Sequence, residues 1–353
     1  IVLQRSLIWT PGENHSAHYR IPGIIRLNDG TLVASIDKRK NSEYDLPEDI
    51  DIEVKHSHDG GKTWSAPTTV AEGRPEQGFG DAAMATDGKN IYMVMVSGSG
   101  LWNYPSQASK PLQMYATKST DGGRSWEPVR EISSEVYTDR FPYGGFFGSG
   151  NGIITSKGRI MFVAAMRMGA NWGGQMDNVL VYSDDQGKSW HSSPIVRSNG
   201  DEAKVIELSD GSLLVSSRNR ASGANERTFV RSRDGGLTWT APATWPELKG
   251  NSCNAALTRY APVGSSKDSH LLLHTLPTSP TCDHLRIFLS EDEGKTWGYS
   301  RELCRGEAVY SEVVILEDGT LGIISEENDR PGFDIYFTRV SLDWIRKGTK
   351  HQR

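Results

Sequence analysis

Apolar residues in this chain gather in short runs that polar segments separate. The longest runs, residues 91–96 and 160–165, have the length of β-strands. Neither approaches the roughly 20 residues that a helix needs to cross a bilayer. Five further β-type runs each lead directly into a polar segment. These runs cover residues 52–56, 113–118, 179–182, 228–231 and 285–289. This alternation of strand-length runs and turns predicts an all-β protein.

The polar segment after each of these five runs repeats one octapeptide, Ser-x-Asp-x-Gly-x-Thr/Ser-Trp. Its copies begin at Ser57, Ser119, Ser183, Ser232 and Ser290. Aspartate and glycine favour a tight turn, because the carboxylate accepts backbone N–H groups and glycine adopts positive φ. The tryptophan can pack beneath the turn. We therefore interpret each octapeptide as a hairpin turn with a structural rather than a catalytic role.

A second turn signal, an Asp-Gly pair or a weaker version of it, alternates with the octapeptide. It occurs in residues 27–32, 87–91, 156–160, 208–213 and 316–321, and a sixth is expected near 265–270. Each unit then holds two hairpins and four strands, and six such units fill the chain. Four-stranded sheets arranged radially form a propeller. The repeat therefore predicts a single domain, residues 1–353, folded as a six-bladed β-propeller. The last unit has no octapeptide, and we expect the N-terminal strand, residues 1–9, to pair with it.

The composition narrows the classes of partner. The net charge is −5, without the basic excess that nucleic-acid binding usually leaves, and no membrane span is expected. The nine histidines show no metal-binding spacing. The three cysteines, Cys253, Cys282 and Cys304, allow one disulfide or none. The chain starts at Ile1 without a methionine, which we interpret as a mature chain whose targeting segment has been removed.

A Tyr-Arg-Ile-Pro-Gly segment at residues 19–23, together with the octapeptides, resembles the sialidase (neuraminidase) family. The resemblance covers nearly the whole chain. It implies a retaining exo-α-sialidase that releases terminal sialic acid from sialylated glycans and needs no cofactor. Arg20 matches one of three family arginines that clamp the carboxylate of the substrate. A guanidinium suits that role because it binds a carboxylate through two parallel charge-assisted hydrogen bonds.

The resemblance also implies an acidic corner of the site. The acid/base aspartate of the family corresponds to Asp45, with Asp49 and Asp51 as nearby alternatives. Arg39 is expected to support the same corner. Asp81, in a Gly-Phe-Gly-Asp segment, either lines the sugar pocket or forms a structural turn.

The strongest match spans residues 201–218. In the family its glutamate pairs with a tyrosine nucleophile and the arginine 16 residues on is the second clamp member, a spacing that Glu202 and Arg218 hold. Tyr310 matches the nucleophile, and Glu326 matches a carboxylate that braces the first arginine. A neutral phenol suits a sugar whose anomeric carbon carries a carboxylate, since an anionic nucleophile would be repelled. With a pKa near 10 the phenol needs an adjacent base, the role expected of Glu202.

One departure concerns the third clamp arginine. The family position, eight residues before Ser290, holds Cys282. Arg286 lies on the same face of a strand by parity and would reach the pocket if the loop of residues 278–283 shifted the register. Otherwise the clamp has two arginines.

Other interpretations of the same residues stay open. The enzyme could hydrolyse a related nonulosonic (2-keto) sugar acid, or transfer the sugar to another sugar as a trans-sialidase does. A catalytically inactive glycan-binding propeller is a further alternative, but a binding module has no use for an acid, a base and a nucleophile together. The aromatic residues Trp102, Tyr104 and Trp172 could line the aglycone side or could be packing residues. Because sialylated glycans lie outside the cytosol, we expect a secreted or periplasmic protein.

Overall fold

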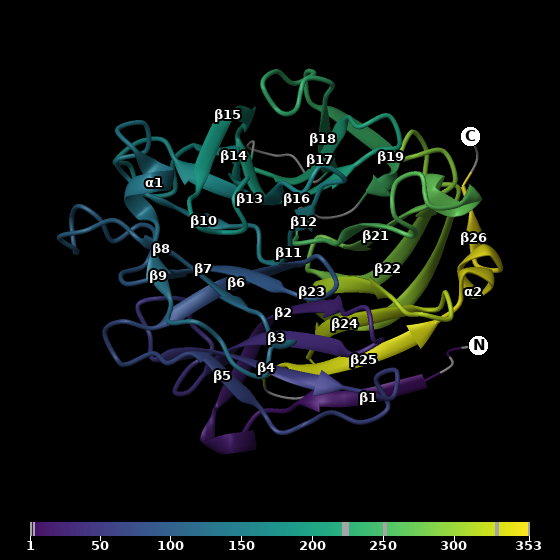
Figure 1. Cartoon of the computed structure of the whole chain (residues 1–353), viewed down its shortest axis with the longest axis horizontal. Coiled ribbons are helices and arrows are strands. Elements are labelled where there is room, and N and C mark those ends of the chain that lie inside the picture. The colour runs from purple at the N-terminus through teal and green to yellow at the C-terminus, as the bar shows by residue number, and fades with distance from the viewer. Residues whose placement is uncertain (1, 3, 221–225, 250–252, 329–331, 352–353) are drawn as a thin grey trace.

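The strands of the chain pair into sheets that follow one another around a common centre (Figure 1). They are seen in a computed structural model, which describes residues 2, 4–220, 226–249, 253–328 and 332–351. Four of the sheets contain four or five strands each, joined mainly by antiparallel hairpins. Their strands are β2 (His18–Arg26), β3 (Leu32–Arg39), β4 (Ile50–Ser57) and β5 (Thr68–Ala71); β6 (Phe79–Thr86), β7 (Ile91–Ser97), β8 (Gln113–Ser119), β9 (Arg130–Glu131) and β11 (Gly150–Asn151); β10 (Gly145–Phe147), β12 (Ile153–Ile154), β13 (Ile160–Arg167), β14 (Met176–Ser183) and β15 (His191–Ser198); and β16 (Gly200–Glu207), β17 (Leu213–Asn219), β18 (Glu226–Ser232) and β19 (Ala243–Lys249).

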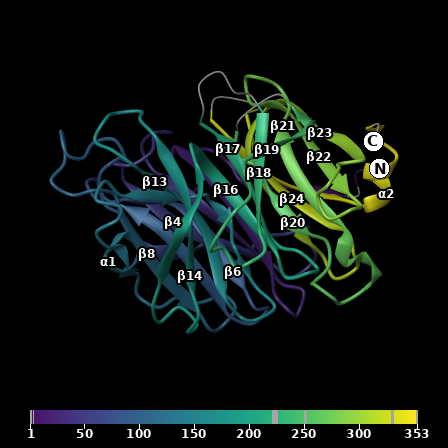
Figure 2. The same cartoon turned by 90° about the horizontal axis from the view of Figure 1, so that it is seen from above.

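A fifth sheet has eight strands and joins the two ends of the chain. The expected pairing of the N-terminal strand with the last unit is confirmed, because β1 pairs antiparallel with β25. Figure 2 shows this sheet on the side of the molecule opposite the short helix α1 (Ser133–Tyr137). Its strands are β1 (Gln4–Trp9), β20 (Leu257–Arg259), β21 (Leu272–Pro277), β22 (Asp283–Ser290), β23 (Tyr299–Ile315), β24 (Leu321–Glu327), β25 (Asp334–Val340) and β26 (Thr349–Lys350).

The prediction of a six-bladed β-propeller is wrong. The described strands form four blade-like sheets and one eight-stranded sheet that resembles a half-barrel. The difference lies in β23, which continues for 17 residues. It pairs with β22 through its first part and with β24 through its second. No proline or Asp-Gly turn occurs within β23, so nothing local ends the strand where the repeat predicts a boundary between units.

The octapeptides form turns between strands, as predicted. The first serine of each copy is the last residue of β4, β8, β14, β18 or β22. In the third copy the Asp185 carboxylate accepts hydrogen bonds from the hydroxyl groups of Ser183 and Ser189 and from the Ser189 amide, at 2.6 to 2.9 Å. Trp190 is buried against the core beneath this turn. The same bonds recur in the other four copies. Hydrogen bonds within each octapeptide therefore determine where its hairpin turns.

The apolar core is divided into clusters that lie between neighbouring sheets. One cluster packs β7 and β8 against β13 and β14, and another packs β13 and β14 against β16 to β18. Apart from α1, the helices are α2 (Leu342–Arg346) and two 3-10 turns, Glu13–His15 and Lys267–His270. None of the helices in the described ranges has the length and apolar character that a bilayer crossing requires.

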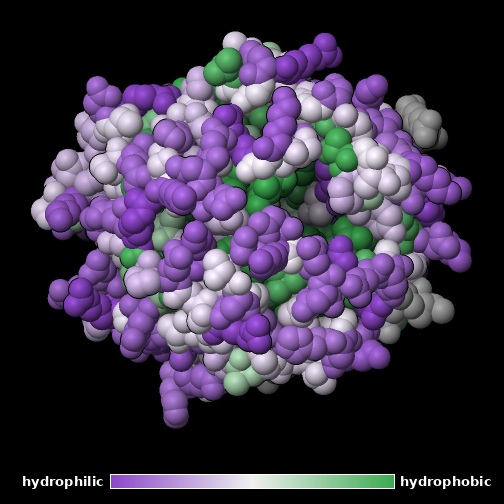
Figure 3. Space-filling view, in the orientation of Figure 1, coloured by the Kyte–Doolittle hydropathy of each residue, from purple (hydrophilic) through white to green (hydrophobic). Residues whose placement is uncertain are grey.

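The two ends of the central strands have opposite character. On the face that Figure 1 presents, apolar residues gather in a central hollow within a polar surface (Figure 3). A hollow of about 420 Å³ is lined there by the later residues of β2, β16 and β23, among them Ile24, Val205 and Val313. The earlier residues of β2 and β16 and the middle of β23 carry the charged side chains described next.

Candidate active site

The predicted site residues gather where four strands are irregular. The pairing register shifts at Arg20 in β2, and at corresponding points around Asp81 in β6, Glu202 in β16 and Tyr310 in β23. A β-bulge bends its strand and re-aims a side chain. Two of these bulges hold Ile21 and Asp81 at positive φ, 66° and 54°, which costs about 1–3 kcal/mol per residue. The irregular backbone thus points four functional side chains toward one place.

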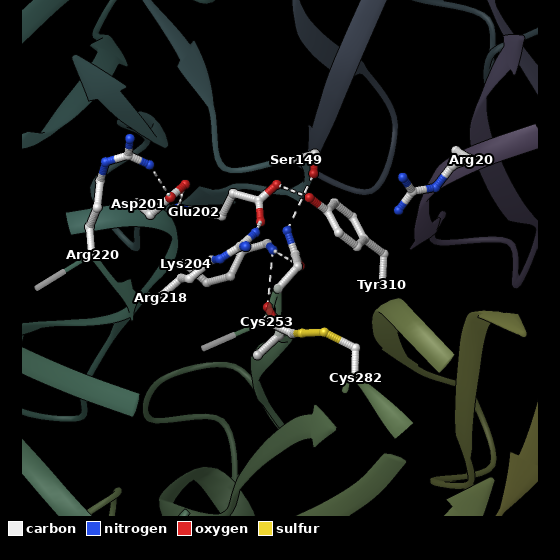
Figure 4. Close-up of polar contacts among 12 residues, drawn as sticks. Arg20, Ser149, Asp201, Glu202, Lys204, Arg218, Arg220, Cys253, Cys282 and Tyr310 are labelled. Carbon is white, nitrogen blue, oxygen red and sulfur yellow. Dashed lines mark hydrogen bonds and ion pairs between the residues drawn. A yellow bond between two sulfur atoms is a disulfide. The ribbon is translucent and has the colours of Figure 1, made fainter. Parts of the chain in front are cut away.

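A hollow of about 440 Å³ occupies this place. Six of the residues that line it were predicted from the sequence as site residues: Arg39, Asp45, Asp81, Glu202, Arg218 and Tyr310. Arg20 points toward Tyr310 from the neighbouring strand (Figure 4), with its guanidinium carbon 5.1 Å from the centre of the Tyr310 ring. The structure therefore brings together residues that are separated by almost the full length of the chain.

A tyrosine and a glutamate meet at the floor of the hollow (Figure 4). The Tyr310 hydroxyl donates a hydrogen bond to one oxygen of Glu202. Arg218 donates to the other oxygen at 3.0 Å. Burial raises the pKa of Tyr310 well above its usual value, and the negative charge of Glu202 acts in the same direction. The resting site therefore holds a neutral phenol beside a carboxylate that can accept its proton.

Arg20 is held in place by a fully buried carboxylate. Its Nη2 donates to one oxygen of Glu326 at 2.6 Å, and its Nε donates to the other at 3.3 Å. The backbone N–H of Ile21 donates to Glu326 as well, at 3.1 Å. The Phe333 ring lies 4.9 Å from the Arg20 guanidinium carbon. These contacts fix the direction of Arg20 before any ligand arrives.

An acidic corner surrounds Arg39, whose side chain is buried. Its Nη2 contacts Asp37 at 3.0 Å and Asp45 at 2.8 Å. The Asp45 side chain is 78% exposed, so its other oxygen is open to the hollow. Burial raises the pKa of Asp37 to about 7 and raises that of Asp81 well above the usual value. These two carboxyl groups therefore carry less negative charge at neutral pH than two ordinary aspartates would.

Several residues in or beneath the hollow were not predicted from the sequence. Asp201 pairs with Arg220 at 3.3 Å, and Arg220 lies over the ring of Trp102. Of the three aromatic residues that the sequence left open between lining and packing, Trp102 and Trp172 line the hollow, with ring centres 6.2 Å apart, whereas Tyr104 packs against Tyr143. Asp37 also lines the hollow. Its position as a charged residue within the otherwise largely apolar strand β3 could have suggested a functional role, but the sequence does not tell which face of a strand is buried.

A second charged pair lies one step further along the same two strands. Lys204 and Glu312 form a buried ion pair at 3.1 Å, two residues beyond Glu202 and Tyr310 respectively. Lys204 also donates to Asn254 and to the carbonyl of Ala255. Burial raises the pKa of Glu312 to about 7. This pair links β16 to β23 directly beneath the tyrosine and the glutamate.

Three residues that the sequence offered for the site, Arg286, Asp49 and Asp51, do not line the hollow. Arg286 donates to the hydroxyl groups of Ser300 and Thr349, so the structure does not bring it to Arg20 and Arg218. Cys282 forms a disulfide with Cys253 beside the site (Figure 4), while Cys304 is free. Asp49 and Asp51 both contact Lys40, at 2.7 and 2.8 Å. Of the three candidate aspartates, Asp45 is therefore the one at the hollow.

The geometry suits nucleophilic attack on an anionic substrate. Two arginines lie on either side of a phenol whose proton a carboxylate can take, and an exposed aspartate stands at the rim. Within the described ranges, no group of three or more histidine, cysteine, aspartate or glutamate side chains is arranged to hold a metal ion. Comparison with known proteins places the chain in a family, because residues 30–323 match the model of the BNR repeat-like domain.

The chain belongs to the BNR repeat-like family.

Sialidases are among the curated relatives of this BNR repeat-like protein. It is 30% identical over 352 residues to a sialidase of Micromonospora viridifaciens, a match that covers 95% of this chain and 53% of that protein. It is 31% identical over 343 residues to a sialidase of Bacteroides fragilis, a match that covers 90% of this chain and 61% of that protein. The chain thus spans between about half and two thirds of the length of these relatives. The resemblance to sialidases stated from the sequence is confirmed.

Solved structures give the same result for the fold of this BNR repeat-like protein. The Hadza microbial sialidase Hz136 superposes with a TM-score of 0.83 and 27% identity, over 97% of this chain and 69% of that one. A sialidase of Trypanosoma rangeli superposes with a TM-score of 0.77 over 98% of this chain and 61% of that one. At 19% identity the second comparison concerns the fold alone.

Proposed function

We propose that this chain is a retaining exo-α-sialidase that releases terminal sialic acid from sialylated glycans. The observation that carries the proposal is the hydrogen bond from the Tyr310 hydroxyl to Glu202, with Arg20 and Arg218 on either side. The sialidases among the relatives support the same class of activity. We further propose that residues 1–353 act as one catalytic domain and that the protein works outside the cytosol, where such glycans lie.

The first half of the reaction forms a covalent intermediate. Arg20 and Arg218 bind the carboxylate of the sugar through charge-assisted hydrogen bonds. Tyr310 attacks the anomeric carbon as its proton passes to Glu202, and the bond from that carbon to the leaving oxygen breaks. Asp45 gives its proton to the leaving oxygen. The products are a sugar bound to the Tyr310 oxygen and a free alcohol.

The second half reverses these roles. Asp45, now a carboxylate, takes a proton from water as the water oxygen attacks the anomeric carbon. The bond to the Tyr310 oxygen breaks, and Glu202 returns the proton to the phenol. Two displacements at one carbon retain its configuration. Because Asp37 and Asp81 have raised pKa values, they repel the carboxylate of the sugar less than ionised groups would.

The alternatives differ in what the site accepts. Arg286 does not reach the hollow, so two arginines hold the carboxylate in this proposal, and a related nonulosonic acid remains a second substrate to test. A trans-sialidase would use the same first half with a sugar in place of water. An inactive glycan-binding protein would bind sialic acid without turnover.

The deciding experiment measures release of a fluorescent alcohol from an aryl α-sialoside, with the matching Kdn glycoside beside it. We expect turnover of the sialoside and retained configuration in the first-formed product. Binding of sialic acid without any turnover would favour the inactive glycan-binding alternative and reject the enzyme. Turnover of the Kdn glycoside alone would reassign the substrate.

A further inference from the structure

The two residues of the proposed proton transfer come from strands of different sheets. Glu202 lies on β16 and Tyr310 on β23, and their side chains meet across the centre of the molecule (Figure 4). Among the described strands, no ladder joins β16 directly to β23. Main-chain hydrogen bonds between the two strands therefore do not set how far one lies along the other. Their relative position depends on side-chain contacts and on the segments packed between them.

The buried ion pair of Lys204 and Glu312 makes such a contact. Lys204 follows Glu202 by two residues on β16. Glu312 follows Tyr310 by two residues on β23. Both members of the pair lie just after the register shift of their strand, where regular pairing with the neighbouring strand has resumed. The pair thus joins the regular part of each strand immediately beside the bulge that carries the tyrosine or the glutamate.

The ammonium group of Lys204 is held from three directions. Its Nζ lies 3.1 Å from Glu312, 3.1 Å from the side-chain oxygen of Asn254 and 3.0 Å from the carbonyl oxygen of Ala255. An ammonium group has three N–H donors, so these contacts provide one acceptor for each. Only 3% of the Lys204 side chain and 2% of the Glu312 side chain are exposed, so water does not compete for the pair.

Two glycines let the backbone between the strands come close to the pair. A Cβ atom at Gly150 would overlap the carboxyl group of Glu312. One at Gly148 would overlap the backbone of Ala203, the residue before Lys204. Gly150 also has a φ of 102°, which residues other than glycine rarely adopt. This segment therefore contacts both strands and restricts where the Glu312 carboxyl group can lie.

We propose that Lys204 and Glu312 are positioning residues for the reaction. Their ion pair fixes β16 relative to β23 and thereby holds the Tyr310 hydroxyl against Glu202. The inference rests on the proposed sialidase function and adds two residues that do not touch the sugar. A buried ion pair stabilises a fold little, because taking two charges out of water offsets their attraction. What the pair supplies is a specific geometry, since apolar side chains would pack equally well at other relative positions of the strands.

The test replaces both charges with apolar side chains, so that neither charge is left buried alone. Lys204→Met/Glu312→Leu should keep a melting temperature close to that of the unmodified protein. We expect kcat for an aryl sialoside to fall by about tenfold to a hundredfold, because a displacement of about 1 Å at a reacting group can cost that much. KM should change by less than about threefold, since Arg20 is held separately by Glu326.

Two further measurements separate positioning from a general loss of packing. Glu312→Gln keeps an oxygen that accepts a hydrogen bond from Lys204, so it should retain kcat within about threefold of the unmodified value. In fluorotyrosine-labelled protein, the fluorine NMR signal that Tyr310→Phe removes reports on the phenol directly. That signal should shift in the Lys204→Met/Glu312→Leu variant.

Lys55 and Glu13 provide a matched control. Lys55 is also buried, is paired with Glu13, and donates to a backbone carbonyl, that of Ile8. Neither residue lines the hollow. Lys55→Met/Glu13→Leu should leave both kcat and the fluorine signal of the nucleophile as they are in the unmodified protein.

Several results would overturn the inference. They are an unchanged kcat in Lys204→Met/Glu312→Leu, a loss confined to KM, and an equal loss in the control. A Lys204→Met/Glu312→Leu variant that does not fold would show that the pair serves stability and would overturn it as well. If the unmodified protein hydrolyses no sialoside, the proposed function itself fails, and the inference fails with it.

Discussion

Replacing Tyr310 with phenylalanine removes one oxygen, and we expect it to reduce catalysis far more than the stability of the fold. Without the hydroxyl no atom at this position can attack the sugar, so we expect kcat/KM for an aryl sialoside to fall by at least about a thousandfold. That factor corresponds to about 4 kcal/mol of activation free energy. The fold also loses something, because Glu202 is buried and one of its oxygens accepts the Tyr310 hydrogen bond. An unsatisfied buried acceptor costs about 1–3 kcal/mol.

Tyr137 offers a matched control for this variant. It is a buried tyrosine whose hydroxyl donates to the carbonyl of Leu112, and it does not itself line the hollow. Tyr137→Phe should reduce the free energy of unfolding by a similar amount, measured by urea denaturation, while turnover of the folded protein stays normal. Tyr310→Phe should still bind an unsaturated sialic acid analogue, measured by calorimetry. A Tyr310→Phe enzyme that keeps a tenth of its activity, or that loses activity only as far as it unfolds, refutes the mechanism.

Three further predictions concern charged residues in and around the hollow. Glu326→Gln should destabilise the protein by about 3 kcal/mol in urea denaturation, because the amide nitrogen must face a donor of Arg20 or of the backbone; additive effects in a double-mutant cycle with Arg20→Met would contradict this. Asp45→Asn should slow hydrolysis of sialyllactose far more than that of an aryl sialoside, whose leaving group barely needs a proton; equal slowing would argue against Asp45 as the acid. Asp37 and Glu312 have folded-state pKa values of about 7, above those of unfolded carboxyl groups, so the folded state binds more protons between about pH 4 and 7. Their contribution to the free energy of unfolding therefore falls as the pH rises through that window, and Asp37→Asn/Glu312→Gln should flatten the pH dependence of the melting temperature.

The features that could be predicted from the sequence are those that depend on hydrogen bonds between residues close together in the chain. Each octapeptide closes its own turn through its aspartate, so the five hairpins can be located from the amino-acid sequence alone. The 16-residue spacing of Glu202 and Arg218 is also local, because both lie on one antiparallel hairpin, β16 and β17, which the turn of residues 208–213 closes. These features need no knowledge of the rest of the chain.

The features that escaped prediction depend on distant partners. Whether a strand ends or continues into another sheet is decided by its neighbours, and β23 continues. Parity places Arg286 on one face of a strand but does not say whether that face meets the hollow, and the structure turns it toward Ser300 and Thr349. The choice of Cys253 as the partner of Cys282 likewise follows from proximity in space. The bulges at Arg20 and Tyr310 were not predicted either, because no residue pattern in these strands indicates a shift in pairing register.

The pairing of β1 with β25 and of Arg20 with Glu326 sets an order for assembly during synthesis. Arg20 and Glu326 are 306 residues apart. At about 5–20 residues per second, a ribosome needs roughly 15 to 60 s to pass from one to the other. Over that interval β1 and β2 have left the ribosome without the strands that complete their contacts, and contacts of such long range slow folding. Arg20 therefore acquires the contacts that fix its orientation only after β24, which carries Glu326, has left the ribosome.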